Sequence, residues 1–206
     1  MSTSPKREYH HADLRAALIE AALDLLAREG ADSLSLRAVA RQAGVSAMAP
    51  YRHYADKEAL LAAVAGFGFS GLRAALLAAD AGAPPGGALI EQAVAYVRYA
   101  LDNPALFRLM FGPRRVFVHP ELLAAGQTAF AVLAGRVSAE TPATEQRENR
   151  ALACWSLVHG LASLFLDGRI TDKRTPAEED AMTRRVAGAL LAPGTRAGSE
   201  PVSRFR

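Results

Sequence analysis

The sequence predicts an all-α protein of about nine helices. Apolar residues recur at helical spacing along most of the chain, and no segment shows the two-residue alternation of a strand. Glycine and proline interrupt this pattern where helices would end, most clearly between Gly82 and Gly87. With 206 residues, of which 50% are hydrophobic, the chain can bury a substantial core. We therefore expect helical domains joined by short turns.

The first expected helix covers residues 13–29 and ends at Gly30, with apolar positions on one face. Before it, residues 1–11 form a polar arm that we expect to be mobile in the free protein and to lie along DNA when bound. The arm carries two adjacent histidines, His10 and His11, which suggest metal binding as an alternative. Adjacent histidines lack the i, i+4 spacing of a preformed helical site, so we expect no metal.

A pair of short helices follows, and the rest of the chain is organised around it. We expect helices over residues 35–43 and 47–54, with Ser35 and Ser46 as their N-caps. Between them Gly44 occupies the position where a helix ends in a left-handed residue. A three-residue turn between two such helices is typical of a helix-turn-helix, which usually presents one helix to DNA.

The second helix of the pair carries hydrogen-bond donors. Tyr51, Arg52 and His53 lie near its capped N-terminus and Lys57 follows, a set suited to phosphate oxygens beside a DNA groove. An ordinary helical hairpin with a solvated polar face would show a similar pattern. The net charge is only +3, and residues 1–60 are neutral overall, so the basic face is local and DNA binding should depend moderately on salt.

The motif Gly44-Val45-Ser46, followed by Tyr51-x-His53-Tyr54-x-x-Lys57-Glu58, resembles the TetR family of bacterial transcriptional regulators. The run Tyr9-His10-His11 and the distal Trp155-Ser-Leu-Val-His159-Gly160 are similar to a TetR subgroup with a Trp-His-Gly signature. The resemblance implies a repressor that binds a near-palindromic operator as a homodimer. It also implies release from DNA when a small molecule enters the C-terminal domain.

The DNA-reading residues follow from this resemblance and from side-chain chemistry. Ala47 and Met48 occupy positions that resemble base-reading sites, yet they can only touch thymine methyl groups. Arg37 is then the better candidate for a guanine contact. Pro50 departs from the family pattern and should make the start of the second helix irregular. The expected DNA-binding residues are Ser35, Arg37, Ser46, Ala47, Met48, Tyr51, Arg52, His53 and Lys57.

The fourth helix should begin after Asp56, as its N-cap, and continue to about residue 79. Gly66, Gly68 and Gly71 weaken its middle, each by about 1 kcal/mol relative to Ala. One interpretation is that this softened helix lets the N-terminal DNA-binding domain change its angle when the C-terminal domain binds a ligand. The other is close packing against a bulky neighbour.

Five further helices complete the expected fold. Thr175-Pro176-x-Glu178 is a capping box with proline at the first helical position. We assign residues 1–56 to the DNA-binding domain, 57–192 to a ligand-binding and dimerisation domain, and 193–206 to a disordered tail. The five expected helices cover residues 88–101, 104–111, 119–137, 144–167 and 176–191.

The helix carrying Trp155 is apolar on two sides, which one partner cannot bury. We expect one side to pack on the core and the other to pair with a second copy, in a two-fold four-helix interface with the last helix. A central helix of a monomer is the alternative. The expected interface residues are Leu157, Leu161, Leu164, Met182, Val186 and Leu190.

A ligand pocket should be lined by aromatic and polarizable side chains with a few polar tips. For each of them an ordinary core position is the alternative, and His159 suits either role. The resemblance favours a pocket in the C-terminal domain without identifying the compound. The candidate residues are Tyr96, Tyr99, Phe107, Met110, Phe111, Phe117, Phe130, Trp155 and His159.

Other functions find little support in the sequence. No phosphate-binding glycine loop or metal-spaced His/Cys cluster is present, so we expect neither enzymatic activity nor a cofactor. The single cysteine, Cys154, excludes an intrachain disulfide; we expect it to pack in the core, with a redox sensor as the alternative. No apolar run approaches the roughly 20 residues of a membrane helix, which favours the cytoplasm. The alternative function is a helical ligand-binding dimer without specific DNA binding.

Overall fold

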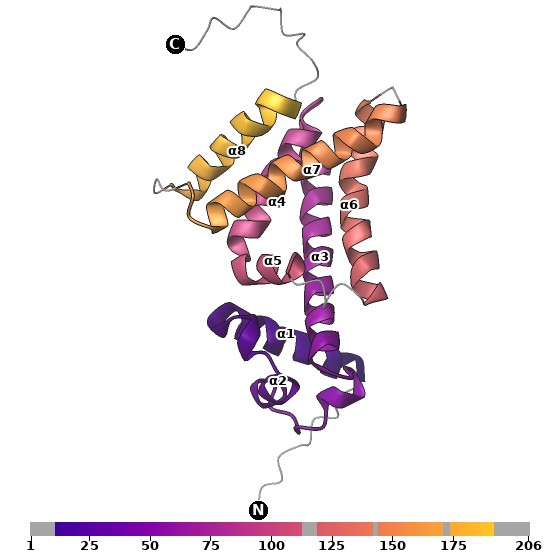
Figure 1. The fold of residues 1–206 in the computed structure, drawn as a ribbon, viewed down its shortest axis with the longest axis vertical. Coiled ribbons are helices and arrows are strands. Elements are labelled where there is room, and N and C mark those ends of the chain that lie inside the picture. Colours follow the sequence, from indigo (N-terminus) through magenta and orange to yellow (C-terminus); the bar gives the residue numbers. More distant parts are fainter. Residues whose placement is uncertain (1–10, 113–118, 142–143, 171–173, 192–206) are drawn as a thin grey trace, which may run out of the picture. The chain divides into compact units, whose positions relative to one another are not determined.

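A computed structural model describes residues 11–112, 119–141, 144–170 and 174–191. These residues form helices and turns without a strand, which confirms the all-α prediction (Figure 1). There are eight α-helices and two short 3-10 helices in the described chain. They are α1 (His11–Glu29), η1 (Ala31–Ser33), α2 (Leu36–Gln42), η2 (Pro50–Arg52), α3 (Lys57–Gly82), α4 (Ala88–Asp102), α5 (Pro104–Met110), α6 (Pro120–Glu140), α7 (Thr144–Leu166) and α8 (Pro176–Leu191).

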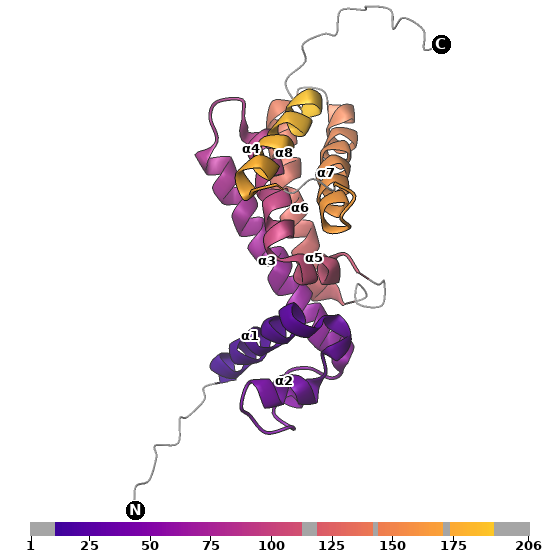
Figure 2. The same cartoon turned by 90° about the vertical axis from the view of Figure 1, so that its left-hand side faces the viewer.

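The chain divides into two compact units. Unit 1 comprises Met1–Ala74 and Asp102–Ala131, and unit 2 comprises Ala75–Leu101 and Val132–Arg206. Within unit 1, α2 packs across α1, as both ribbon views show (Figures 1 and 2). Within unit 2, α8 lies along α4 (Figure 2) and α7 contacts α8.

Two predicted N-caps and one predicted helix end are confirmed. Ser35 Oγ accepts a hydrogen bond from the Ala38 amide at 3.1 Å and starts α2. Asp56 Oδ1 accepts one from the Ala59 amide at 2.8 Å and starts α3. Gly44 has a φ of 68°, the left-handed conformation that ends α2.

The predicted helix over residues 47–54 is wrong. The structure has turns after Ser46 and only the 3-10 helix η2 from Pro50 to Arg52, whose N-cap is Ala49 and not Ser46. Pro50 has no amide hydrogen to donate to the Ser46 carbonyl, so an α-helical first turn cannot close there. Instead the Ala49 amide donates to that carbonyl at 2.9 Å, and the chain turns tightly. The described part of residues 1–56 therefore holds two α-helices, α1 and α2, and two 3-10 helices, η1 and η2, in place of three α-helices.

The glycines of α3 differ in their surroundings. A Cβ on Gly68 would lie 2.6 Å from Met110 Sδ and 3.1 Å from Leu106 Cδ1, so Gly68 allows α3 and α5 to pack closely. A Cβ on Gly66 would meet nothing within 4 Å. Close packing is thus confirmed for Gly68 and does not explain Gly66. The helix runs without interruption from Lys57 to Gly82.

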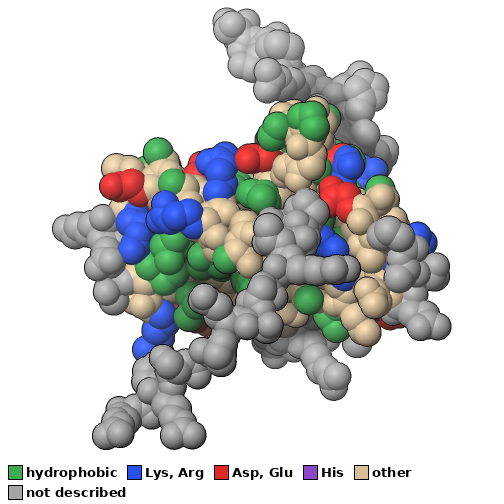
Figure 3. Space-filling model, turned by 90° about the horizontal axis from the view of Figure 1, so that it is seen from above, with side chains coloured by type: hydrophobic (Ala, Val, Ile, Leu, Met, Phe, Trp, Pro, Cys, Tyr) green, Lys and Arg blue, Asp and Glu red, His purple; other side chains and the backbone are tan. Residues whose placement is uncertain are grey.

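Ion pairs hold the helices of unit 2 together. Arg98 on α4 pairs with Glu179 at 3.0 Å and with Asp180 at 2.8 Å on α8, and Arg184 on α8 pairs with Glu91 on α4 at 2.9 Å. On the face shown in Figure 3, basic and acidic side chains stand close together between apolar patches. Its described part therefore carries mixed charge.

Two helices, α3 and α6, are long and apolar enough to cross a membrane by length and composition alone. In the most apolar 18-residue stretch of each helix, 50% of α3 is buried inside the protein and 17% of α6 is buried. Core helices of soluble proteins pass the same test, so this is weak evidence for a membrane span.

Several sequence predictions lie outside the described residues. They concern the arm before residue 11, Phe117 and the tail after residue 191.

Candidate functional site

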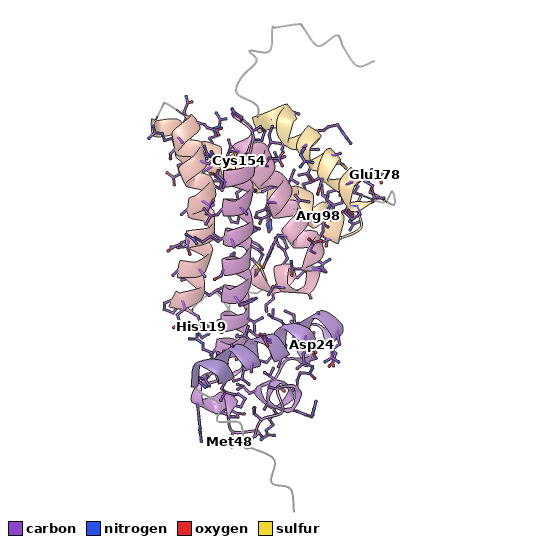
Figure 4. The ribbon with its side chains drawn as sticks, turned by 180° about the vertical axis from the view of Figure 1, so that it is seen from behind. Asp24, Met48, Arg98, His119, Cys154 and Glu178 are labelled. Carbon is purple, nitrogen blue, oxygen red and sulfur yellow. The ribbon has the colours of Figure 1, made fainter. Side chains whose placement is uncertain are left out.

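The predicted DNA-reading segment is exposed on unit 1. Met48 is 69% exposed and lies on the loop between α2 and η2, where Figure 4 labels it. Tyr51 is 43% exposed, although aromatic side chains are usually more buried than this. Ser46, Ala47 and Arg52 are exposed as well. A short stretch thus presents one thioether, one phenol and one guanidinium to a partner.

The preceding helix adds a second exposed edge. Arg37, in the first turn of α2, is exposed, as is Arg41 in the last turn. The Ser35 hydroxyl already accepts a bond from the Ala38 amide as the N-cap, while its own proton remains available for a phosphate. Nearby acidic charge is partly neutralised, because Asp24 on α1 pairs with Arg28 at 3.1 Å and accepts a bond from Gln42 at 2.6 Å.

Two predicted DNA ligands have partners within unit 1. Lys57 Nζ donates to the Asp32 carbonyl at 3.1 Å, which ties the start of α3 to the loop after α1. His53 is half-buried beside Tyr54, with their ring centroids 6.4 Å apart. Both side chains therefore contribute to the fold of unit 1.

Sequence reasoning missed Tyr54 and Arg15. Tyr54 is 3% exposed, and burial raises the pKa of its phenol while the Arg15 guanidinium opposes that shift. Arg15 also pairs with Glu121 at the start of α6, at 3.6 Å. No local pattern reveals these contacts, because their partners are far apart in the chain.

A polar cluster lies within unit 2 among the predicted ligand-binding residues. Tyr96 Oη lies 2.9 Å from His159 Nδ1, and Trp155 Nε1 donates to Tyr96 Oη at 3.3 Å. Burial lowers the pKa of His159, which favours its neutral ring. The Nδ1 atom of a neutral ring can accept a hydrogen bond from the Tyr96 hydroxyl. Tyr99, on the same helix as Tyr96, is half-buried and burial raises its pKa.

The other predicted pocket residues that the structure describes lie in unit 1. The rings of Phe107 and Phe111 contact each other at a tilt, with centroids 4.8 Å apart, and Phe69 meets Phe111 edge-on at 5.3 Å. Met110 is fully buried next to Gly68, and Phe130 is 37% exposed. For Phe107 and Met110 this arrangement is that of ordinary core residues.

The predicted dimer residues of α7 and α8 differ in exposure. Leu164 is 47% and Leu190 71% exposed, whereas Leu161 is buried in its own chain. Leu157, Met182 and Val186 are half-buried. Leu152 on α7, which we did not include, is 51% exposed. An apolar strip therefore reaches the surface of unit 2.

Two further observations bear on the alternatives. Cys154 is buried, and burial raises the pKa of its thiol, which favours a packing role over a redox sensor. In the described parts of the chain, no three His, Cys, Asp or Glu side chains are grouped so as to hold a metal ion.

Comparisons with known proteins now bear on the family. Residues 18–64 match the family described as bacterial regulatory proteins, tetR family, and residues 89–190 match the family described as Tetracyclin repressor-like, C-terminal domain. The chain is also 30% identical, over 185 residues, to an uncharacterized HTH-type transcriptional regulator of Mycobacterium tuberculosis. The match covers 90% of this chain and 85% of that protein. The chain belongs to the TetR family.

Solved structures agree with this assignment. A protein with unknown function from Rhodococcus sp. RHA1 is 31% identical and has a TM-score of 0.74, covering 91% of this chain and all of that one. A regulatory protein of the tetR family from Rhodococcus RHA1 is 25% identical with a TM-score of 0.59, covering 84% of this chain and 96% of that one. This TetR-family chain is a DNA-binding transcriptional regulator, and its family is not one of enzymes.

Proposed function

We propose that this TetR-family regulator is a ligand-responsive repressor in the cytoplasm. It binds a near-palindromic operator as a homodimer and is released when a small molecule enters the C-terminal domain. Residues 1–56 contact DNA, and residues 57–192 bind the effector and dimerise. The observation that carries this proposal is the exposure of Met48, Tyr51 and Arg52, which present a thioether, an aromatic and a guanidinium group on unit 1.

The proposed DNA contacts fall into two classes. Arg37 is exposed and carries the bidentate donor pair that guanine accepts, so it reads sequence. Met48 and Ala47 are exposed and apolar, and they touch thymine methyl groups. The remaining contacts go to phosphates and set the position of the protein. These phosphate ligands are Ser35, Ser46, Tyr51, Arg52, His53 and Lys57.

The proposed dimer uses the apolar strip of unit 2. Leu164 and Leu190 are exposed although they are large and apolar, and burying both against a second copy removes them from water. The proposed interface further includes Leu157, Leu161, Met182 and Val186 at its edge and base. Two-fold symmetry would place the same patch of both copies face to face, so that a side chain of α7 on one copy can meet one of α8 on the other and the reverse.

The proposed effector site is built around Tyr96, Trp155 and His159. Three ring systems with polar atoms meet within unit 2, and such groups orient a ligand in an otherwise apolar pocket. We expect no catalytic activity.

Selection of purified protein against random duplex DNA across a salt series tests this function. Enrichment of an inverted repeat, with affinity that falls as salt rises, is the expected result. Failure to enrich any sequence at low salt would instead support a helical ligand-binding dimer without specific DNA binding. The short η2 turn is the observation that would then explain it.

A further inference from the structure

A cavity of about 760 Å³ lies entirely within unit 1. Side chains of α1, η2, α3 and α6 line it. Its wall on α3 consists mostly of small residues, among them Ala59, Ala63 and Gly66, together with Phe67. A Cβ on Gly66 would meet nothing within 4 Å, so the wall is open there. This volume lies within the range of about 300–1,000 Å³ that is typical of small-molecule sites.

The charge of the lining is predominantly basic. Arg15 and Arg52 supply two guanidinium groups, and His53 and His119 add two imidazoles. Figure 4 labels His119, which directly precedes α6. Among the described lining residues Glu121 is the one carboxylate, and it pairs with Arg15 at 3.6 Å. Both side chains of this pair are more than half exposed, so water screens it and a ligand anion can compete for Arg15.

A buried hydroxyl supplies an independent sign of a ligand. Tyr54 lines the cavity and is 3% exposed, and its Oη has no hydrogen-bond partner among the described residues. The Arg15 guanidinium lies close enough to lower the pKa of this phenol, first as a hydrogen-bond donor and then by its charge, but their contact falls short of full hydrogen-bonding geometry. A buried hydroxyl without a partner costs free energy, which a ligand acceptor would recover.

We propose that this cavity binds an amphipathic anion, a carboxylate or sulfonate on an apolar body. The anionic group lies between Arg15 and Arg52 and accepts a hydrogen bond from the Tyr54 hydroxyl. The apolar body lies along the small residues of α3 and against Phe67, which is 53% exposed. This site lies in unit 1, whereas the proposed effector site around Tyr96 lies in unit 2.

Occupancy of the cavity also lowers DNA affinity, a second step that rests on the proposed function. Arg52 lines the cavity and is also a proposed phosphate ligand. A bound anion holds this guanidinium and neutralises its charge, so a DNA phosphate loses a partner. Tyr51 belongs to the same 3-10 turn and is held with it.

Titration of the full chain with 1-anilinonaphthalene-8-sulfonate, a fluorescent amphipathic sulfonate, tests the site. Gly66→Leu fills the open wall, and Arg15→Gln removes the anion partner. Gly135→Leu is the matched control, because Gly135 is also helical, a Cβ there also meets nothing within 4 Å, and it lies in unit 2 outside the cavity. Both glycine variants gain the same helix propensity.

We expect Gly66→Leu and Arg15→Gln each to weaken binding of this probe about tenfold or more, while Gly135→Leu binds like the original chain. Equal probe affinity in all four proteins would overturn the site. Should Gly66→Leu fail to fold, Arg15→Gln still tests whether the cavity binds the probe. Arg15 is exposed, so its substitution leaves the apolar core unchanged.

The DNA step is measured separately, by anisotropy of the selected operator with and without the probe. The expected result is a loss of DNA affinity in the original chain and in Gly135→Leu, but not in Gly66→Leu. Unchanged DNA affinity with the probe bound would overturn the coupling. Absence of any DNA binding would count against the proposed function, while the probe titration would still report on the cavity.

Discussion

At the scale of single residues, Gly66 and Gly68 make a matched pair on α3. We expect Gly66→Ala to raise the free energy of unfolding by about 0.5 to 1 kcal/mol, because helical alanine loses less backbone entropy than glycine. Gly68→Ala has the same entropic gain, but its Cβ would lie 2.6 Å from the sulfur of the fully buried Met110. We expect it to be at least about 1 kcal/mol less stable than Gly66→Ala. Urea unfolding measures both, and equal stabilities would contradict the close approach.

Arg37 and Lys57 differ in what they contribute to DNA binding. We expect Arg37→Ala to weaken operator binding by about 1 to 3 kcal/mol and to leave binding to random DNA nearly unchanged. Lys57→Ala should weaken binding to both alike, because a phosphate contact carries no sequence information. Lys57 also donates to the Asp32 carbonyl, so its variant needs a parallel stability measurement. Equal losses on both kinds of DNA for Arg37→Ala would contradict its assignment.

Residue roles were predictable from the sequence where the partner is nearby in the chain. Ser35, Asp56 and the pair Thr175 and Glu178 act as caps through contacts three residues apart, and all were predicted. The hydrogen bond from Lys57 to the Asp32 carbonyl joins residues 25 positions apart, and it was not predicted. Spacing encodes the first kind of contact and carries no information on the second.

At the scale of elements, η2 shows where pattern and covalent chemistry disagree. Apolar spacing and a serine before residue 47 favoured a helix, but Pro50 removes a donor that its first turn requires. Pro50 itself is buried, in the position where we noted an unusual residue. The irregular start was thus predictable from Pro50, whereas the reduction to a single 3-10 turn was not.

A carboxylate joins three helices in unit 2. Asp80 on α3 accepts a bond from Arg136 Nε on α6 at 2.7 Å and one from Gln92 on α4 at 2.7 Å. The bond from Arg136 is the main reason that the pKa of Asp80 lies below its usual value. The charged form therefore stabilises the fold above the unfolded pKa of about 3.9, and this contribution disappears as pH falls through the lower folded pKa.

We expect Asp80→Asn to lower the free energy of unfolding at pH 7 by about 1 to 2 kcal/mol. The difference from the original chain should begin to shrink below about pH 4, where the Asp80 carboxylate of the unfolded chain becomes protonated, and disappear as the folded carboxylate is protonated at lower pH. Asp32→Asn, at an exposed position, is the control and should change stability by less than about 0.5 kcal/mol. Denaturant unfolding at several pH values measures this, and an equal loss at pH 3 and pH 7 would show that charge is not the cause.

At the scale of the whole molecule, the proposed dimer depends on exposed leucines. We expect Leu164→Glu combined with Leu190→Glu to give a monomer by light scattering and to weaken operator binding about tenfold or more. The control is Leu123→Glu on α6, where the leucine is also 47% exposed but lies outside the proposed interface. A double variant that remains dimeric would place the interface elsewhere.

The all-α class and most helix positions could be predicted, because apolar spacing and capping residues mark most of the helices; residues 47–54 are the exception. The grouping of aromatic residues could not. Phe107 and Met110 pack in unit 1 while Tyr96 and Trp155 meet in unit 2, although all four share the composition of a pocket. Composition says which side chains suit a cavity, and only the fold decides which of them meet.

The arginine pairs between α4 and α8 complicate any salt titration of this regulator. Arg98 and Arg184 hold α8 through partly exposed ion pairs, which added salt screens. The proposed interface includes Leu190 on the same helix. A plot of log affinity against log salt would then contain loosening of α8 as well as counterion release from DNA, and its slope would overstate the number of phosphates contacted. Recording the protein's mass at each salt concentration would separate the two contributions.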